Sequence, residues 1–124
     1  MGKQERKDKP MAKQFENVKN ALVVRLKGEI DQCAASEIRD NIDIEIMNSP
    51  KKNLIIDLEG VTLMDSSGIG LIVGRYKTVR NLGGNLLLSG GSSYVRKMID
   101  LSGIGKIITM YKNIQEADKA LKTN

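Results

Sequence analysis

Two adjacent serines, Ser66 and Ser67, are the residues of this chain best suited to chemistry. They follow Asp65 and precede Gly68, at the point where an apolar strand pattern changes into a helical one. At such a corner the hydroxyls are exposed and lie beside backbone N–H groups of the first helical turn that have no partner. One serine is expected to cap the helix, and one cap is enough. The other hydroxyl, next to an acid, therefore fits a site of phosphorylation.

Composition argues against catalysis at this corner. The chain contains no His and one Cys, so a nucleophilic serine would need an unusual lysine base, and a metal site would lack its commonest ligands. A phosphate-binding Gly-x-x-x-x-Gly-Lys-Ser/Thr loop is absent. Surface solvation is the default interpretation of Asp57 and Glu59, which lie near the end of a predicted strand. We therefore expect no enzyme activity, no metal and no cofactor.

Three glycines near the serines resemble a dinucleotide-binding fingerprint, but the pattern fails. Gly68, Gly70 and Gly74 have the spacing GxGxxxG, and no acid for a ribose occurs between Ser66 and Ile99. We interpret Gly68 and Gly70 as positions where the helix start approaches a neighbour closely, and Gly74 as a packing contact.

Length and composition predict one soluble domain with one core. The chain has 124 residues, 40% hydrophobic and 28% charged, as in ordinary globular proteins. It contains neither a membrane-spanning stretch nor a secretory signal, and the lone Cys33 fits a reducing compartment. We therefore predict a cytoplasmic protein with no membrane partner.

The formal charge of +5 is concentrated at the start of the chain. Residues 1–13 hold five cations and two acids, which is a net +3 and leaves +2 for the rest. We expect residues 1–13 to form a disordered basic tail and residues 14–124 to form the domain; Met11 offers an alternative start. A nucleic-acid arm is the other interpretation of this tail. Aromatic residues make up only 3% of the chain, so a base-stacking set is lacking and no nucleic-acid partner is expected.

Strand and helix patterns alternate along the domain. Strands are predicted at 15–18, 21–27, 53–58, 86–88 and 107–110, and helices at 34–47, 67–82, 92–103 and from 113 onward. Alternating elements indicate parallel pairing through right-handed crossovers, and the opening hairpin adds an antiparallel strand. The predicted fold is therefore α/β, with a mixed sheet of four to five strands and about four helices.

Four segments carry a resemblance to a known family. They are Asp65–Lys77, the preceding apolar run Leu54–Leu58, the turn Gly28–Asp31, and Asp100–Gly103. Together they resemble the STAS domain of anti-sigma factor antagonists, and they are most similar to the antagonists of the sporulation anti-sigma-F factor. The resemblance covers about residues 14–122. It implies a mixed sheet with helices mainly on one face.

The resemblance also implies a role in partner switching. The unphosphorylated antagonist binds an anti-sigma factor that is a serine kinase, the sigma factor is freed, and phosphorylation then ends binding. A metal-dependent serine phosphatase restores the antagonist. The phosphorylation site falls on Ser66. The implied partner surface contains Asp31, Asp65, Ser67, Gly68 and Ile69. A STAS scaffold subunit of a stress-signalling or lipid-transport assembly is the alternative.

Two segments depart from the family pattern. The charged segment before residue 14 has no counterpart that we can place, and Cys33–Ala35 stands where close relatives carry more polar residues. Contacts beside Asp31 are therefore expected to differ, whereas Ser66 is unaffected.

Overall fold

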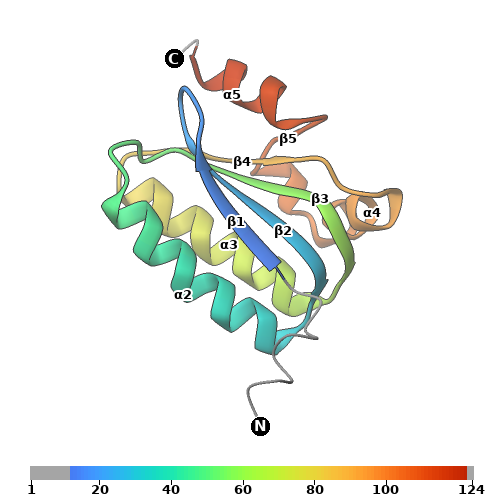
Figure 1. Ribbon diagram of the computed structural model, residues 1–124. Helices are drawn as coiled ribbons and strands as arrows, with labels where there is room; N and C mark the ends of the chain where they lie inside the picture. The colour runs from blue at the N-terminus through green and yellow to red at the C-terminus, as the bar shows by residue number, and fades with distance from the viewer. Residues whose placement is uncertain (1–11, 123–124) are drawn as a thin grey trace, which may run out of the picture.

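The computed structural model describes residues 12–122, so the predicted tail lies almost wholly outside the described residues. The elements, shown in Figure 1, are β1 (Ala12–Asn17), β2 (Leu22–Ile30), α2 (Gln32–Asn48), β3 (Leu54–Met64), α3 (Ser66–Asn81), β4 (Leu86–Ser89), α4 (Ser93–Ser102), the 3-10 turn η1 (Ile104–Lys106), β5 (Met110–Tyr111) and α5 (Ile114–Lys122). In this part of the chain, no helix is long and apolar enough to cross a membrane.

The strands form one mixed sheet in which spatial order follows chain order, β1-β2-β3-β4-β5. The β1–β2 hairpin is antiparallel, and the other three neighbouring pairs are parallel. Each parallel step moves in the same direction across the sheet, so right-handed crossovers place α2, α3 and α4 on one face. Figure 1 shows α5 apart from these helices, beyond the short strand β5. The predicted mixed α/β fold is confirmed.

Alternating side chains of the central strands build two cores of unequal size. On β2, Leu22, Val24 and Leu26 point into the larger core, which the helices α2, α3 and α4 cover. The intervening Val23 belongs to the smaller core, where α5 contributes Ala117 and Leu121. Helix α2 buries a stripe of apolar side chains at helical spacing against the sheet: Ala34, Ile38, Ile42 and Ile46. Most of the apolar burial therefore lies between the sheet and the face covered by α2, α3 and α4.

Strand β3 is longer than predicted, and this extension positions the site. The apolar pattern indicated an end at residue 58, but pairing with β2 continues to Met64 through two register shifts. Gly60 makes this continuation possible, because a Cβ there would lie 3.0 Å from the carbonyl oxygen of Leu26. The extension carries the chain to Met64, which pairs with Ile30 at the end of β2.

The predicted strand at 107–110 is largely wrong. The N–H groups of Ile107 and Ile108 both donate to the carbonyl of Ile104, at 2.9 and 2.8 Å. Because the turn already uses these donors, pairing with β4 is confined to Met110 and Tyr111. Ile107, predicted to lie in a strand, is exposed.

The last two helices begin within one residue of their predicted positions, 92 and 113. The Ser92 hydroxyl accepts from the Val95 N–H at 3.2 Å, and Gly103, with φ of 86°, ends α4. The Asn113 side chain accepts from the Glu116 N–H at 2.9 Å at the start of α5. The last turn of α4 lies beside Ser66, which is described below.

Candidate functional site

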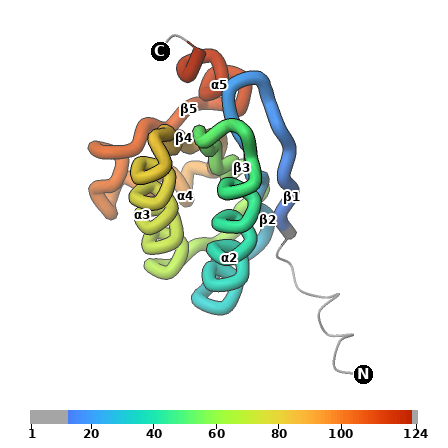
Figure 2. Tube along the Cα trace, turned by 90° about the vertical axis from the view of Figure 1, so that its left-hand side faces the viewer, coloured from blue at the N-terminus to red at the C-terminus, as the bar shows by residue number. Residues whose placement is uncertain are grey.

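The starts of α2 and α3 lie side by side at one end of the molecule. Ile30 and Met64 are the last paired residues of β2 and β3, and the Asp65 N–H lies 3.4 Å from the Ile30 carbonyl oxygen. Figure 2 shows both helices leaving this end in the same direction. Asp31 and Asp65, which follow the paired residues, are thereby brought together and line the same two surface hollows.

Each helix is capped by the aspartate that precedes it. Asp31 Oδ1 accepts from the Ala34 N–H at 2.9 Å, and Asp65 Oδ1 accepts from the Ser67 N–H at 2.8 Å. The expectation that Ser66 or Ser67 caps α3 is therefore wrong. Asp65 has the extended backbone of a capping residue, whereas the helix already begins at Ser66. A carboxylate also suits the positive end of a helix, and a cap contributes about 1 kcal/mol.

Because Asp65 supplies the cap, both serine hydroxyls are free. Neither makes a hydrogen bond with any residue between 12 and 122. Ser66 is exposed and lines a hollow next to α4, whereas Ser67 is half-buried and lines a groove next to α2. The two serines thus lie on different surfaces.

Gly68 allows the start of α3 to lie directly on the strand ends. A Cβ at this position would be 2.2 Å from Met64 Cγ and 3.3 Å from Ile30 Cγ2. The predicted close approach is confirmed here. It is wrong for Gly70, and the predicted packing contact of Gly74 is also wrong, because a Cβ at either position would meet nothing within 4 Å. Those two glycines leave open space along α3 instead of filling it.

An apolar hollow lies on the α4 side of Ser66. It has a volume of about 330 Å³ and is lined by Ser66, Ile69, Met98, Leu101 and Ser102. Leu101 is 79% exposed, whereas the predicted site residue Ile69 is half-buried against the core. The exposed Leu101 and the half-buried Ile69 give the surface beside the Ser66 hydroxyl an apolar character.

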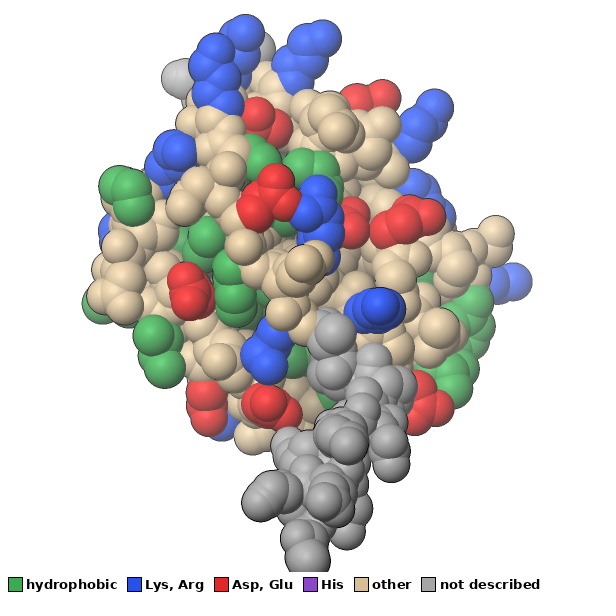
Figure 3. Space-filling model, in the orientation of Figure 1, with side chains coloured by type: hydrophobic (Ala, Val, Ile, Leu, Met, Phe, Trp, Pro, Cys, Tyr) green, Lys and Arg blue, Asp and Glu red, His purple; other side chains and the backbone are tan. Residues whose placement is uncertain are grey.

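An acidic hollow lies on the opposite side of Asp65. Its lining includes four carboxylates and no Lys or Arg: Asp31, Glu37, Asp40 and Asp65. Cys33, also exposed, lines it as well. Figure 3 shows acidic side chains along the lower edge of the molecule. Among residues 12–122, no three His, Cys, Asp or Glu side chains are grouped to hold a metal ion.

An ion pair that the sequence did not reveal connects α2 and α3, and the Asp43 side chain in it is 40% exposed. Arg75 is only 8% exposed, and its Nε lies 3.1 Å from Asp43 Oδ1. Neither atom has a hydrogen-bond partner, so the contact is an ion pair without hydrogen-bond geometry. The adjacent Tyr76 is half-buried, so the arginine is the more buried of the two.

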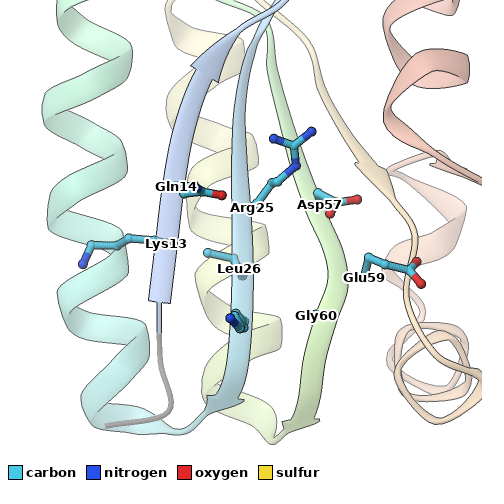
Figure 4. A pocket seen from close by; sticks show the side chains of 8 residues that line it. Lys13, Gln14, Arg25, Leu26, Asp57, Glu59 and Gly60 are labelled. Atoms are coloured by element: carbon cyan, nitrogen blue, oxygen red, sulfur yellow. The ribbon is translucent and has the colours of Figure 1, made fainter. Parts of the chain in front are cut away.

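A further hollow, also missed, lies on the sheet face turned away from α2 and α3 (Figure 4). Arg25 and Lys27 of β2 and Asp57 and Glu59 of β3 line its volume of about 480 Å³. Asp57, expected to be solvated, is 7% exposed and accepts from the Ser89 hydroxyl at 2.8 Å. The signal was the charged residue at every second position of each strand. With both signs of charge present, this hollow favours no single ligand.

Comparison with known proteins agrees with the fold. The model of the STAS domain family matches residues 9–117. The anti-sigma F factor antagonist of Paenibacillus polymyxa is 33% identical over 88 residues, which cover 71% of this chain and 75% of that protein.

Two solved structures are similar over nearly the whole chain. The anti-sigma factor antagonist SpoIIAA in its unphosphorylated form is 33% identical with a TM-score of 0.78, covering 91% of this chain and 98% of its own. The phosphorylated form of SpoIIAA, a Bacillus cell fate determinant, is 32% identical with a TM-score of 0.68, covering 88% and 99%. The chain therefore belongs to the STAS domain family and, within it, to the anti-sigma factor antagonists.

Proposed function

We propose that this protein is a phosphorylation-controlled anti-sigma factor antagonist. Its unphosphorylated form binds an anti-sigma factor that is also a serine kinase, and the sigma factor is freed. The kinase then transfers the γ-phosphoryl group of ATP to Ser66 Oγ, which loses its proton as ADP forms, and the complex dissociates. A metal-dependent serine phosphatase removes the phosphate. The chain works in the cytoplasm and catalyses nothing itself.

The observation that carries this proposal is the free, exposed hydroxyl of Ser66 on the first residue of α3. Asp65 provides the cap, so modification of Ser66 removes no helix-stabilising hydrogen bond. The start of a helix also tolerates an anion. The fold should therefore persist after phosphorylation, which a reversible switch requires.

The surfaces around Ser66 support docking of a protein partner. On one side, Ile69, Met98 and Leu101 offer apolar area, whose burial contributes about 25 cal/mol per Å². On the other side, Asp31 and Asp65 offer negative charge to a basic partner group. A partner that covers both sides also covers Ser66.

The same surfaces explain how phosphate would end binding. A phosphoserine carries about −1.5 to −2 charges. Placed beside Asp65, and near Asp31, it meets like charge; a like-charge pair at about 4 Å costs roughly 1 kcal/mol in water and 4 kcal/mol near a protein surface. Its bulk also enters the docked interface. Since each 1.4 kcal/mol is about tenfold in affinity, these effects suffice to dissociate a complex of ordinary strength.

The experiment is intact-mass analysis after incubation with the cognate anti-sigma kinase and ATP. One phosphate is expected on the wild type and on Ser67→Ala, and none on Ser66→Ala. A phosphate that persists on Ser66→Ala would refute the assigned site. No phosphate on any form would favour the alternative, a scaffold subunit of another assembly.

A charge-mimicking pair of variants tests the release step. Ser66→Asp should bind the anti-sigma factor about 100-fold more weakly, because a fixed negative charge joins Asp65 at the interface. Ser93→Asp is the matched control, since Ser93 is also an exposed serine at the first residue of a helix, α4. Equal binding of Ser66→Asp and wild type, measured by calorimetry, would rule out the electrostatic release.

A further inference from the structure

The groove between α2 and α3 differs in charge from the hollows around it. Five donor side chains line it and no acid does: Gln32, Ser36, Arg39, Ser67 and Arg75. The acidic hollow on the other side of the α2 start shares Gln32 and Ser36 with this groove but is otherwise lined by carboxylates and Cys33. The α2 residues at its edge thus separate a donor-lined surface from an acidic one.

The groove has room for a side chain from outside the molecule. Its volume is about 320 Å³, and Gly70 and Gly74 form one wall. A Cβ at either glycine would meet nothing within 4 Å, so this space is not filled by the protein itself. Leu71 and Ala35, both buried, form the floor. The open space therefore lies directly beside the donors.

Two arginines provide the positive charge. Arg39 is exposed; its Nε lies 3.1 Å from Asp40 Oδ1, and its Nη2 lies 3.4 Å from the Ser36 hydroxyl. An exposed pair of this kind contributes about 0–1 kcal/mol to stability, so Arg39 can exchange Asp40 for another carboxylate at little cost. Arg75 is held deeper, against Asp43 and 3.4 Å from the Thr78 hydroxyl, and its Nε has no hydrogen-bond acceptor.

We infer that this groove receives an acidic side chain, Asp or Glu, of the anti-sigma factor that docks over Ser66. The inference rests on the proposed function and extends it by naming the chemistry of a second contact. Ser67 lines the groove while its neighbour Ser66 lines the apolar hollow, so a partner centred on the serine pair reaches both. Arg39 matches a carboxylate through its planar donor fork. The docking surface is thus dipolar: acidic beside Asp31 and basic beside Arg39.

The test compares three variants for binding to the cognate anti-sigma factor by calorimetry and stopped-flow association. Arg39→Ala should weaken binding about five- to tenfold and flatten the salt dependence of the association rate. Gly70→Leu fills the groove without changing charge, and it should weaken binding by about tenfold or more. Arg80→Ala, an arginine in the last turn of α3, is the matched control and should bind like the wild type.

Outcomes for the groove and for the switch are separable. Thermal unfolding of Gly70→Leu confirms that the variant is folded before its binding is interpreted. If Arg39→Ala and Gly70→Leu bind with wild-type affinity while the wild type binds normally, the groove inference is overturned and the Ser66 switch stands. If the wild type itself does not bind, the proposed function fails and the groove inference fails with it.

Discussion

The β2–α2 and β3–α3 corners of this protein share one design and carry different residues. In each, a parallel strand ends, an aspartate caps the next helix, and the helix begins at once. The β2–α2 corner continues with Gln32 and Cys33, whereas the β3–α3 corner continues with Ser66 and Ser67. In both corners the aspartate provides the capping hydrogen bond, and the residue after it does not. Because the aspartate holds the helix start, the next residue can be a phosphorylation site without a structural duty.

The largest expected effect comes from moving the serine hydroxyl from the start of α3 to the start of α2. The double variant Ser66→Ala with Gln32→Ser places a serine at the first helical residue of α2 and removes the one on α3. We expect no phosphate from the anti-sigma kinase, because Gln32 lies between the acidic hollow and the donor groove and lacks the apolar hollow beside Ser66. Intact mass is the readout. A phosphate on this double variant, but not on Ser66→Ala alone, would mean that the corner design alone defines the substrate.

Positions 34 and 68 both lie three residues after a capping aspartate, but position 68 should be more stable with glycine and position 34 with alanine. Gly68→Ala should destabilise the protein by about 1–2 kcal/mol despite the better helix propensity of alanine, because the methyl group clashes with Met64. Ala34→Gly should cost about 1 kcal/mol through helix propensity. Urea unfolding measures both. A stabilised Gly68→Ala would show that Met64 relaxes freely and that the close approach is not required.

The caps Asp31 and Asp65 should contribute similar amounts to the free energy of unfolding, and their contributions should not be additive. Asp31→Ala and Asp65→Ala are each expected to lose about 1 kcal/mol of unfolding free energy. Both carboxylates line the same hollows, and each single variant also relieves their mutual repulsion. The double variant should therefore cost about 0.5 kcal/mol more than the sum, less at high salt. Glu45→Ala, which removes an exposed acid within α2, is the control. If the losses of Asp31→Ala and Asp65→Ala are strictly additive, the two carboxylates do not interact.

The smallest expected effect distinguishes the two glycines of the α3 start. Gly70→Ala should stabilise the protein by up to about 1 kcal/mol, because the position is helical and its Cβ would meet open space. This outcome, opposite in sign to that of Gly68→Ala, would appear as a raised midpoint in thermal unfolding. A loss of stability would show that the α2–α3 groove is tighter than the structure indicates.

The family resemblance, not the residue pattern, implied that Asp31 lies near the start of α3, and in the structure Asp31 and Asp65 line the same two hollows. Neighbouring parallel strands end at one edge, and the residues after them converge there whatever their side chains. Which residue caps α3 could not be predicted in this way. A run of Asp65, Ser66 and Ser67 offers three good capping residues, and the choice depends on where the strand releases the chain, which the bulge at Gly60 sets.

Other residues escaped prediction because their environment is tertiary. Glycines along one helix look alike in sequence, yet Gly68 faces Met64 while Gly70 faces open space. Arg75 is buried because Asp43 on α2 supplies the opposite charge, and no spacing within α3 reveals that partner. Asp57 is buried because Ser89 of the next strand donates to it. Each of these depends on a contact between distant parts of the chain.

The sequential order of the sheet has a consequence for folding. Each new strand pairs with the one before it, so no strand must enter between two that are already paired. The loops to be closed are single crossovers, which keeps the entropic cost of each step low. We expect folding to spread from the β2–β3 pair outward, and the two-residue edge strand β5 with α5 to open first. Native-state hydrogen exchange should accordingly be fastest in β5 and α5 and slowest in β2 and β3.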